Sequence, residues 1–263
     1  MSFITIDSQK CKLDGICALA CPMGLIIQNK NEIPQAVQDA EKICVGCGHC
    51  ISVCHFEALS IGGVSPKDLA PVKKDMAVSK EAMVQMIKEH RSVREFKNKP
   101  VPHDVLAHLI DATRWSPTAA NLQPVQWLVI EDAKEVQRIA GVIAEGARQI
   151  GFNPAMLQAW EKGNDVFLRN APHIVVTHAK KENYMPTTDC TIALTCFDMM
   201  AYTYGIGTCW AGVLMIIAKH YPPLVEALKI PEGNEIYGAM MIGYPKYSYH
   251  KIPPRKPANI TWK

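Results

Sequence analysis

Cysteine spacing is the feature that most constrains this chain. Seven of its ten cysteines lie before residue 55, although the chain has 263 residues. From Cys44 to Cys54 they follow the string C-x2-C-x2-C-x3-C, and part of that string also occurs earlier in the chain at a constant offset. The repeated pairs are Cys11 and Cys44, Cys17 and Cys50, and Cys21 and Cys54. An odd number of crowded cysteines suits a disulfide framework poorly, so the pattern predicts a metal site.

The spacing also favours one kind of metal site over another. An iron–sulfur cubane needs four thiolates at four corners, and two-residue gaps let a tight loop present three of them. Zinc is the alternative, but it takes four ligands per ion, in paired C-x2-C knuckles. A single overlapping string therefore favours clusters.

This spacing resembles that of the bacterial two-cluster ferredoxins, over about the first 60 residues. The resemblance implies that each cubane takes three ligands from one copy and one from the other. It assigns Cys21, Cys44, Cys47 and Cys50 to one cluster and Cys11, Asp14, Cys17 and Cys54 to the second. Asp14 stands where the family usually has cysteine. Three interpretations stay open: it ligates iron, it leaves that corner open so that a [3Fe-4S] cluster forms, or it is a solvated turn residue, since Asp-Gly is a common turn signal.

Composition separates this segment from the rest. The segment 1–65 holds 4 Lys, no Arg and 6 Asp or Glu, which gives it a net charge of −2. Because the whole chain has a net charge of +3, the remaining residues carry +5. Gly62, Gly63 and Pro66 interrupt any periodic pattern at that point. We expect a ferredoxin-like domain at 1–65, a linker at 66–78 and a second domain at 79–263.

Apolar patterns predict an α+β fold for both parts. In the first, short strands at 3–6, 25–27 and 58–61 flank the cysteine loops. In the second, strands are expected at 125–130, 173–177 and 237–242, and helices after Ser79, after Pro102, and at about 133–149, 155–169, 187–204 and 214–229. The cysteines of this part, Cys190, Cys196 and Cys209, are expected to be buried core residues.

The second part also carries a candidate anion site. Arg91, Ser92 and Arg94 follow the first expected helix, and guanidinium forks with a hydroxyl suit phosphate oxygens. Alone, this motif is more typical of a solvated basic turn than of a phosphate site.

It stands within an ordered series of segments, at 91–96, 115–124, 189–194, 204–212, 241–245 and 253–257. The series closely resembles the FMN-dependent nitroreductase family, over roughly residues 80–257. The resemblance implies an α+β domain that forms a homodimer, with FMN at the subunit interface. It assigns the FMN phosphate to Arg91, Ser92, Arg94 and Arg255, the flavin ring and ribityl chain to Asn121 and Gln123, a wall from the partner subunit to Pro117 and Thr118, and the region beside flavin N5 to Trp210, Ala211 and Gly212.

Several classes of protein are excluded. The net charge of +3 offers no basic run for nucleic acid. No apolar run approaches the roughly 18 residues of a membrane span, and no secretory leader is present, so we expect a cytoplasmic protein. The chain contains no nucleophile elbow, metalloprotease pair or dinucleotide-binding motif, and no catalytic side chain is expected because FMN carries the chemistry.

Together these features predict an iron–sulfur flavoprotein oxidoreductase. Electrons are expected to enter through two clusters, reduce FMN and leave to a small planar organic acceptor such as a nitroaromatic or a quinone. Two alternatives remain. In the first, the chain is an electron-transfer module that exchanges electrons with a redox-protein partner. In the second, it is an NAD(P)H-dependent nitro or flavin reductase in which the clusters have an accessory role.

Overall fold

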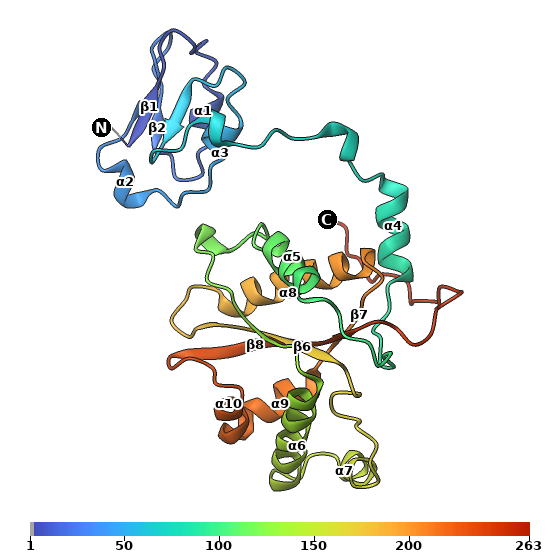
Figure 1. Ribbon diagram of the computed structural model, residues 1–263. Helices are drawn as coiled ribbons and strands as arrows, with labels where there is room; N and C mark the ends of the chain where they lie inside the picture. Colours follow the sequence, from blue (N-terminus) through green and yellow to red (C-terminus); the bar gives the residue numbers. More distant parts are fainter. Residues whose placement is uncertain (1–2) are drawn as a thin grey trace. The chain divides into compact units, whose positions relative to one another are not determined.

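The computed structural model describes residues 3–263, which form two compact units (Figure 1). One comprises the residues up to Ala77 with Ala120–Leu122, and the other comprises Val78–Ala119 and Gln123–Lys263. The first two residues, where the predicted domain 1–65 begins, lie outside the described residues. The predicted linker contains two short 3-10 turns, η1 (Pro66–Asp68) and η2 (Lys74–Met76), and its residues are exposed from Lys67 onward.

The first unit is built from two small antiparallel strand pairs with short helices between them. The pairs are β1 (Ile4–Ile6) with β4 (Leu59–Ile61) and β2 (Ile26–Ile27) with β3 (Gln35–Ala36). The helices are α1 (Ile16–Ala20), α2 (Ala40–Ile43) and α3 (His49–Ser52). Its core is small, and two of the predicted ligands, Cys17 and Cys50, belong to it.

The second unit is a four-stranded antiparallel sheet of order β5-β6-β8-β7, with helices on both faces (Figure 1). The strands are β5 (Gln126–Ile130), β6 (His173–Lys180), β7 (Gly207–Trp210) and β8 (Asn234–Gly243). The helices are α4 (Lys80–Glu89), α5 (His103–Thr113), α6 (Ala133–Gln149), α7 (Pro154–Glu161), α8 (Pro186–Thr203), α9 (Gly212–His220) and α10 (Pro222–Ala227).

Two apolar layers hold this sheet. Helices α6, α9 and α10 cover one face, where Ile139, Ile143 and Ile217 are fully buried. Helices α5 and α8 cover the other, where Leu109 and Phe197 are fully buried. Burying side chains of this size contributes about 2 kcal/mol each, so the sheet is the rigid platform on which the loops at its edges are mounted.

The predicted α+β fold is confirmed, and so are most of its elements. Ser79 caps α4 by accepting the N–H of Ala82 at 3.1 Å, and α6 spans the predicted residues. The strand β7 was not predicted, because its four residues show no clear alternation.

Three expectations were wrong. The helix predicted at 155–169 ends at Glu161, because Gly163 takes a left-handed conformation with φ 82°. The helix predicted at 214–229 is divided into α9 and α10, since Pro222 forces the preceding Tyr221 into an extended conformation. Cys196 is exposed, because it lies on another side of α8 from the buried Cys190.

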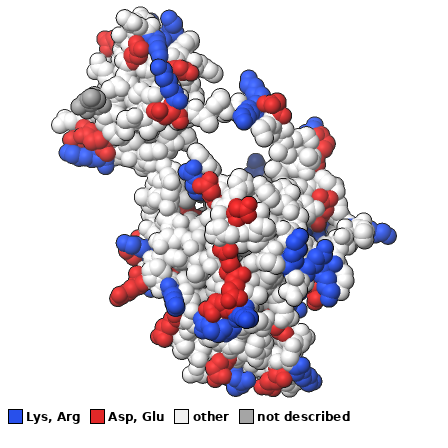
Figure 2. All heavy atoms as spheres, in the orientation of Figure 1, with Lys and Arg blue, Asp and Glu red and all other residues white. Residues whose placement is uncertain are grey.

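Surface charge is mixed. In the face shown in Figure 2, acidic and basic side chains alternate over both units and form no continuous basic surface. Among residues 3–263, no helix has the length and apolar character that a membrane crossing requires.

Candidate functional site

Four predicted cluster ligands line one cavity in the first unit. They are Cys21, Cys44, Cys47 and Cys50. Three come from the second copy of the repeat and Cys21 from the first. Backbone N–H groups donate to two of the sulfurs, from Leu25 to Cys21 Sγ at 3.3 Å and from Gly46 to Cys44 Sγ at 3.4 Å. Donors aimed at sulfur favour the thiolate, which is the form that binds iron.

The other four predicted ligands line a second cavity. They are Cys11, Asp14, Cys17 and Cys54. Ala58 donates its N–H to Cys54 Sγ at 3.4 Å. Asp14 also serves a local turn, because its Oδ1 accepts the N–H of Ile16 at 3.2 Å. The Asp14 carboxylate therefore lines the cavity and shapes the turn at once.

The two cavities repeat each other in backbone detail. Gly15 and Gly48 occupy equivalent places in the two copies and have the same left-handed conformation, with φ 72° and 71°, before α1 and α3. Leu13 and Gly46 are a second such pair, at φ 60° and 62°. A leucine costs more than a glycine in this conformation. The first copy therefore keeps the same loop conformation as the second, although Leu13 is less favourable there than glycine.

These residues fit a pair of four-iron clusters. In the described part of the chain no three His, Cys, Asp or Glu side chains converge on a single-ion site. The thiols surround a space instead, as ligands at the corners of a cluster do. Burial raises the pKa of Cys50 to about 11 and also raises that of Cys17. Both therefore need a metal ion to hold them as thiolates, since a coordinating thiol is deprotonated outright.

In the second unit, the segment that carries Arg91, Ser92 and Arg94 crosses the end of the sheet. The N–H of Val93 donates to Thr208 O on β7 at 2.8 Å, and the N–H of Lys97 donates to Tyr244 O at 2.8 Å. Val93 is buried, so the neighbouring Ser92 and Arg94 face outward and are exposed.

Asp198 on α8 holds this segment at two points, His90 before it and, through Thr208, Val93 in its middle. Its Oδ1 accepts from His90 Nε2 at 3.0 Å and from the hydroxyl of Thr208. His90 ends α4, and Thr208 holds Val93 through its carbonyl oxygen. The candidate anion-binding residues thus lie on a stretch of backbone that is fixed on either side.

The loop that carries Pro117, Thr118, Asn121 and Gln123 has a strained backbone. Ala120, Asn121 and Gln123 are all left-handed, with φ between 49° and 54°. Within the second unit two hydrogen bonds hold it, from Gln123 N–H to Thr118 Oγ1 at 3.0 Å and from Ala119 N–H to Asp189 Oδ1 at 2.9 Å. Asp189 is 2% exposed, and its Oδ2 is buried without a hydrogen-bond partner in the described residues.

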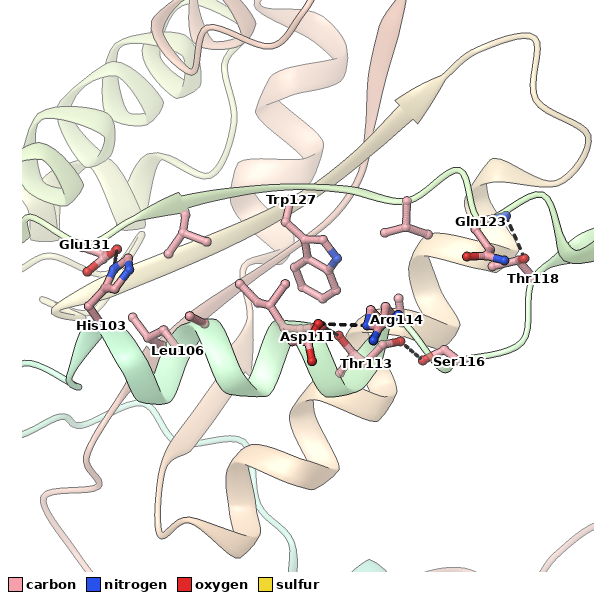
Figure 3. A pocket seen from close by; sticks show the side chains of 15 residues that line it. His103, Leu106, Asp111, Thr113, Arg114, Ser116, Thr118, Gln123, Trp127 and Glu131 are labelled. Atoms are coloured by element: carbon pink, nitrogen blue, oxygen red, sulfur yellow. Dashed lines mark hydrogen bonds and ion pairs between the residues drawn. The ribbon is translucent and has the colours of Figure 1, made fainter. Parts of the chain in front are cut away.

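Thr118 and Gln123 also line a cavity of about 490 Å³ in the second unit (Figure 3). It lies between α5 and the edge strand β5, with the Trp127 ring over its middle and the His103–Glu131 pair at its far end. The lining is mostly apolar with a few polar groups, which is the usual character of a site for an organic ligand.

The turn from β7 to α9 places the last three predicted residues. Trp210 is 37% exposed and Ala211 is buried. The Ala211 N–H is already used, because it donates to Ala239 O at 2.8 Å. Gly212 opens α9, so its N–H has no partner within the helix, and a Cβ added there would meet no atom within 4 Å. Among the residues that the structure describes, Gly212 therefore has no partner for its N–H and has open space beside its Cα.

The predicted flavin residues thus form two groups. Ser92 lies beside Cys209 and its hydroxyl lowers the pKa of that thiol, while burial, the larger effect, raises it. This puts the anion-binding segment next to the Trp210–Gly212 turn. Among the described residues no hydrogen bond or ion pair joins this group to Thr118 and Gln123, and none joins it to Arg255, which lies in the exposed C-terminal segment.

These observations fit a flavin mononucleotide. Arg91 and Arg94 donate to backbone carbonyls and, among the described residues, have no carboxylate partner, which suits a phosphate. The open space at Gly212 suits the edge of the flavin ring. Asp198 and Thr208 were missed by sequence reasoning, because the link from Asp198 to His90 joins residues far apart in the chain and leaves no local pattern.

Comparison with known proteins covers both units. Residues 87–244 match the nitroreductase family, and residues 3–65 match the 4Fe-4S dicluster domain. A putative NADH dehydrogenase/NAD(P)H nitroreductase of Methanothermobacter thermautotrophicus is 24% identical over 65% of this chain and 81% of its own length. An FMN reductase [NAD(P)H] of Bacillus subtilis is 24% identical over 65% of this chain and 69% of its own length. A crystal structure of a nitroreductase with bound FMN from Bacteroides fragilis superposes with a TM-score of 0.57, at 22% identity, over 68% of this chain and 96% of that one.

Proposed function

The chain belongs to the nitroreductase family, and from that premise we propose that it is an FMN-dependent oxidoreductase fed by two iron–sulfur clusters on the same chain. Electrons enter through the clusters and leave from FMN to a small planar organic acceptor, such as a nitroaromatic or a quinone. When bound, a cluster transfers one electron at a time and FMN exchanges one or two.

One observation carries this proposal. The eight candidate ligands, taken from two sequence copies, sort into two cavities of four, and each cavity combines residues of both copies. Such a crossed arrangement is what two four-iron clusters need. The same chain holds a separate unit with the nitroreductase fold, so an electron carrier and a flavin site are encoded together.

The roles proposed for the second unit are binding and orientation. Ser92 and Arg94 bind the flavin phosphate, joined by Arg91 and, from the C-terminal segment, by Arg255. Asp198 keeps that segment in place through His90 and Thr208. The free N–H of Gly212 donates to the ring edge, and Trp210 and Ala211 form the wall beside it.

A second subunit completes the proposed site. In a homodimer, Asn121 and Gln123 meet the flavin ring and ribityl chain, and Pro117 and Thr118 line the same wall from the partner subunit. We further propose the domain limits 1–65, 66–78 and 79–263. None of the ten cysteines, all of which lie in the described residues, forms a disulfide, and this supports a reducing location such as the cytoplasm.

The first test is composition after anaerobic purification. About eight iron atoms, eight acid-labile sulfides and one FMN per chain are expected for two four-iron clusters and one flavin. About seven iron atoms would indicate a three-iron cluster beside Asp14. Stoichiometric zinc in place of iron would contradict the cluster proposal.

The second test is the direction of electron entry, because the two relatives named above carry NAD(P)H in their names. Direct reduction by NAD(P)H is therefore the second candidate function. In anaerobic stopped flow, pre-reduced clusters are expected to bleach the flavin absorbance within one turnover. Rapid bleaching by NADH or NADPH with the clusters still oxidised would favour the second candidate.

A further inference from the structure

Arg169 is an arginine that no sequence pattern singled out. The structure places it in the loop between α7 and β6 instead of at the end of a helix. Its backbone is left-handed, with φ 60°, and the next residue, Asn170, is left-handed as well. Neither is glycine, so this conformation carries a strain that the surrounding structure must hold in place.

The buried carboxylate of Asp165 holds it. Asp165 is 4% exposed, and its two oxygens accept four hydrogen bonds. The donors are the N–H groups of Phe167 at 3.0 Å, Leu168 at 2.9 Å and Asn170 at 2.9 Å, and the side chain of Gln137 at 3.2 Å. The residues on either side of Arg169 are thereby fixed, while the Arg169 side chain itself stays partly exposed.

The loop lies against the candidate phosphate segment. At Gly243 an added Cβ would meet Pro172 at 2.7 Å and Phe96 at 2.9 Å, so the end of this loop and the end of the 91–96 segment contact the same residue. The Arg94 and Arg169 guanidinium groups both lie close enough to the Cys209 thiol to lower its pKa. Both cations therefore lie within electrostatic range of one thiol on β7, the same thiol whose pKa the Ser92 hydroxyl lowers.

Some arginines of the chain have a carboxylate partner, and others do not. Among the described residues Arg114, Arg138 and Arg148 form ion pairs with carboxylates. Arg169 forms none, and neither do the three arginines that the sequence assigned to phosphate, which are Arg91, Arg94 and Arg255. Two cations near one thiol repel each other, and Asp198, whose carboxylate is also near that thiol, already accepts hydrogen bonds from His90 and Thr208. A phosphate dianion bound at this place offsets that repulsion.

We propose that Arg169 is a further phosphate-binding residue, which with Ser92 and Arg94 grips the phosphate monoester of the flavin. The inference rests on the proposed function, since it assigns an additional contact to the same flavin site. Arg169 binds the phosphate from the α7–β6 side, opposite the segment that carries Ser92 and Arg94.

The test is flavin binding to the full-length chain after removal of its FMN. Fluorescence titrations with FMN and with riboflavin, which lacks the phosphate, are compared for Arg169→Ala and Arg169→Lys. The matched control is Arg148→Ala, whose arginine pairs with Glu145. Arg169→Ala is expected to weaken FMN binding about tenfold or more, since a charge-assisted hydrogen bond is lost. Arg169→Lys is expected to be intermediate, and riboflavin binding is expected not to change.

Two results would overturn the inference. One is FMN affinity in Arg169→Ala equal to that of Arg148→Ala. The other is an equal loss for FMN and riboflavin, which would mean that the variant only disturbs the loop. Arg94→Ala separates this failure from failure of the flavin site itself. If Arg94→Ala weakens FMN binding and Arg169→Ala does not, only the role of Arg169 is refuted; if neither does, the proposed phosphate site is wrong.

Discussion

His173 begins the central strand β6 with both ring nitrogens engaged. Its Nε2 accepts the N–H of Val101 at 2.8 Å, so the proton lies on Nδ1, which donates to Glu131 O at 2.8 Å. This pairing exists only for the neutral ring. Burial lowers the pKa of His173 below the usual 6.5, and burial does the same for His178 on the same strand.

The first prediction is a loss of stability in mild acid. Between the lowered pKa of folded His173 and the unfolded value near 6.5, the unfolded chain binds a proton that the native chain does not. The contribution of His173 to the unfolding free energy of the second unit should therefore be fully present well above pH 6.5 and decrease as the pH drops below it. All five tryptophans lie after residue 114, so urea unfolding followed by tryptophan fluorescence reports this unit.

The variant His173→Gln has a side chain with one acceptor and one donor group, but this side chain does not bind a proton in this pH range. It should show a smaller decrease than the wild type as the pH falls below 6.5. Equal slopes for the two proteins would show that His173 does not titrate in this way.

Asp14 carries the second residue-scale prediction. Its carboxylate lines the same cavity as Cys11, Cys17 and Cys54, and oxygen binds iron less firmly than thiolate does. Mild chelation of the anaerobic protein is expected to remove about one iron per chain, leaving a three-iron signal in the electron paramagnetic resonance spectrum. Asp14→Cys should retain that iron. Loss of the same iron at the same rate from both proteins would make Asp14 a turn residue only.

At the scale of elements, two glycines at the ends of β7 and α9 differ in what surrounds them. Gly207 is packed, because an added Cβ would meet Val93 Cγ2 at 2.5 Å. Gly212 is open, with no atom within 4 Å of an added Cβ. One glycine is needed for close approach of the anion-binding segment to the sheet, and the other leaves space where the flavin ring is proposed.

The third prediction uses these glycines as a pair. Gly207→Ala should lower the unfolding free energy by about 1–3 kcal/mol through overpacking and weaken FMN binding as well. Gly212→Ala should leave the unfolding free energy unchanged to within about 0.5 kcal/mol, because alanine suits the first turn of a helix, yet weaken FMN binding. Calorimetric titration with FMN and urea unfolding separate the two effects. Undiminished FMN affinity in Gly212→Ala would remove that residue from the site.

At the scale of the whole molecule, the two units have separate cores. The first core is small and includes Cys17 and Cys50, so much of its stability must come from bound metal. The second has an apolar layer on each face of a sheet and needs no metal.

The fourth prediction follows from that separation. Anaerobic calorimetry of the holoprotein should show two unfolding transitions. Removing the clusters with a chelator and an oxidant should abolish the transition of the first unit and leave that of the second, which excess FMN should still raise. A single transition that disappears when the clusters are removed would contradict independent cores.

The elements that could be predicted from the sequence are those whose interacting residues lie close together along the chain. The helix at 133–149 and the Ser79 cap were predicted because their signals lie within a few positions of each other. The strand β7 was missed, since a short edge strand is defined by its pairing with β8 and not by its own pattern. The α7 boundary was missed because a single left-handed glycine ended the helix.

The sequence by itself determined the chemistry that this chain can carry. The cluster ligands, set out in two copies of one motif, identify themselves by spacing, because one short loop must deliver three ligands to one cluster. Only the tertiary structure decided how distant residues meet. It tied His90 to Thr208 through Asp198, and it placed the guanidinium groups of Arg94 and Arg169 within electrostatic range of the same thiol, that of Cys209. Such contacts arise from packing against a shared sheet, and packing leaves no periodic trace in the residues that it brings together.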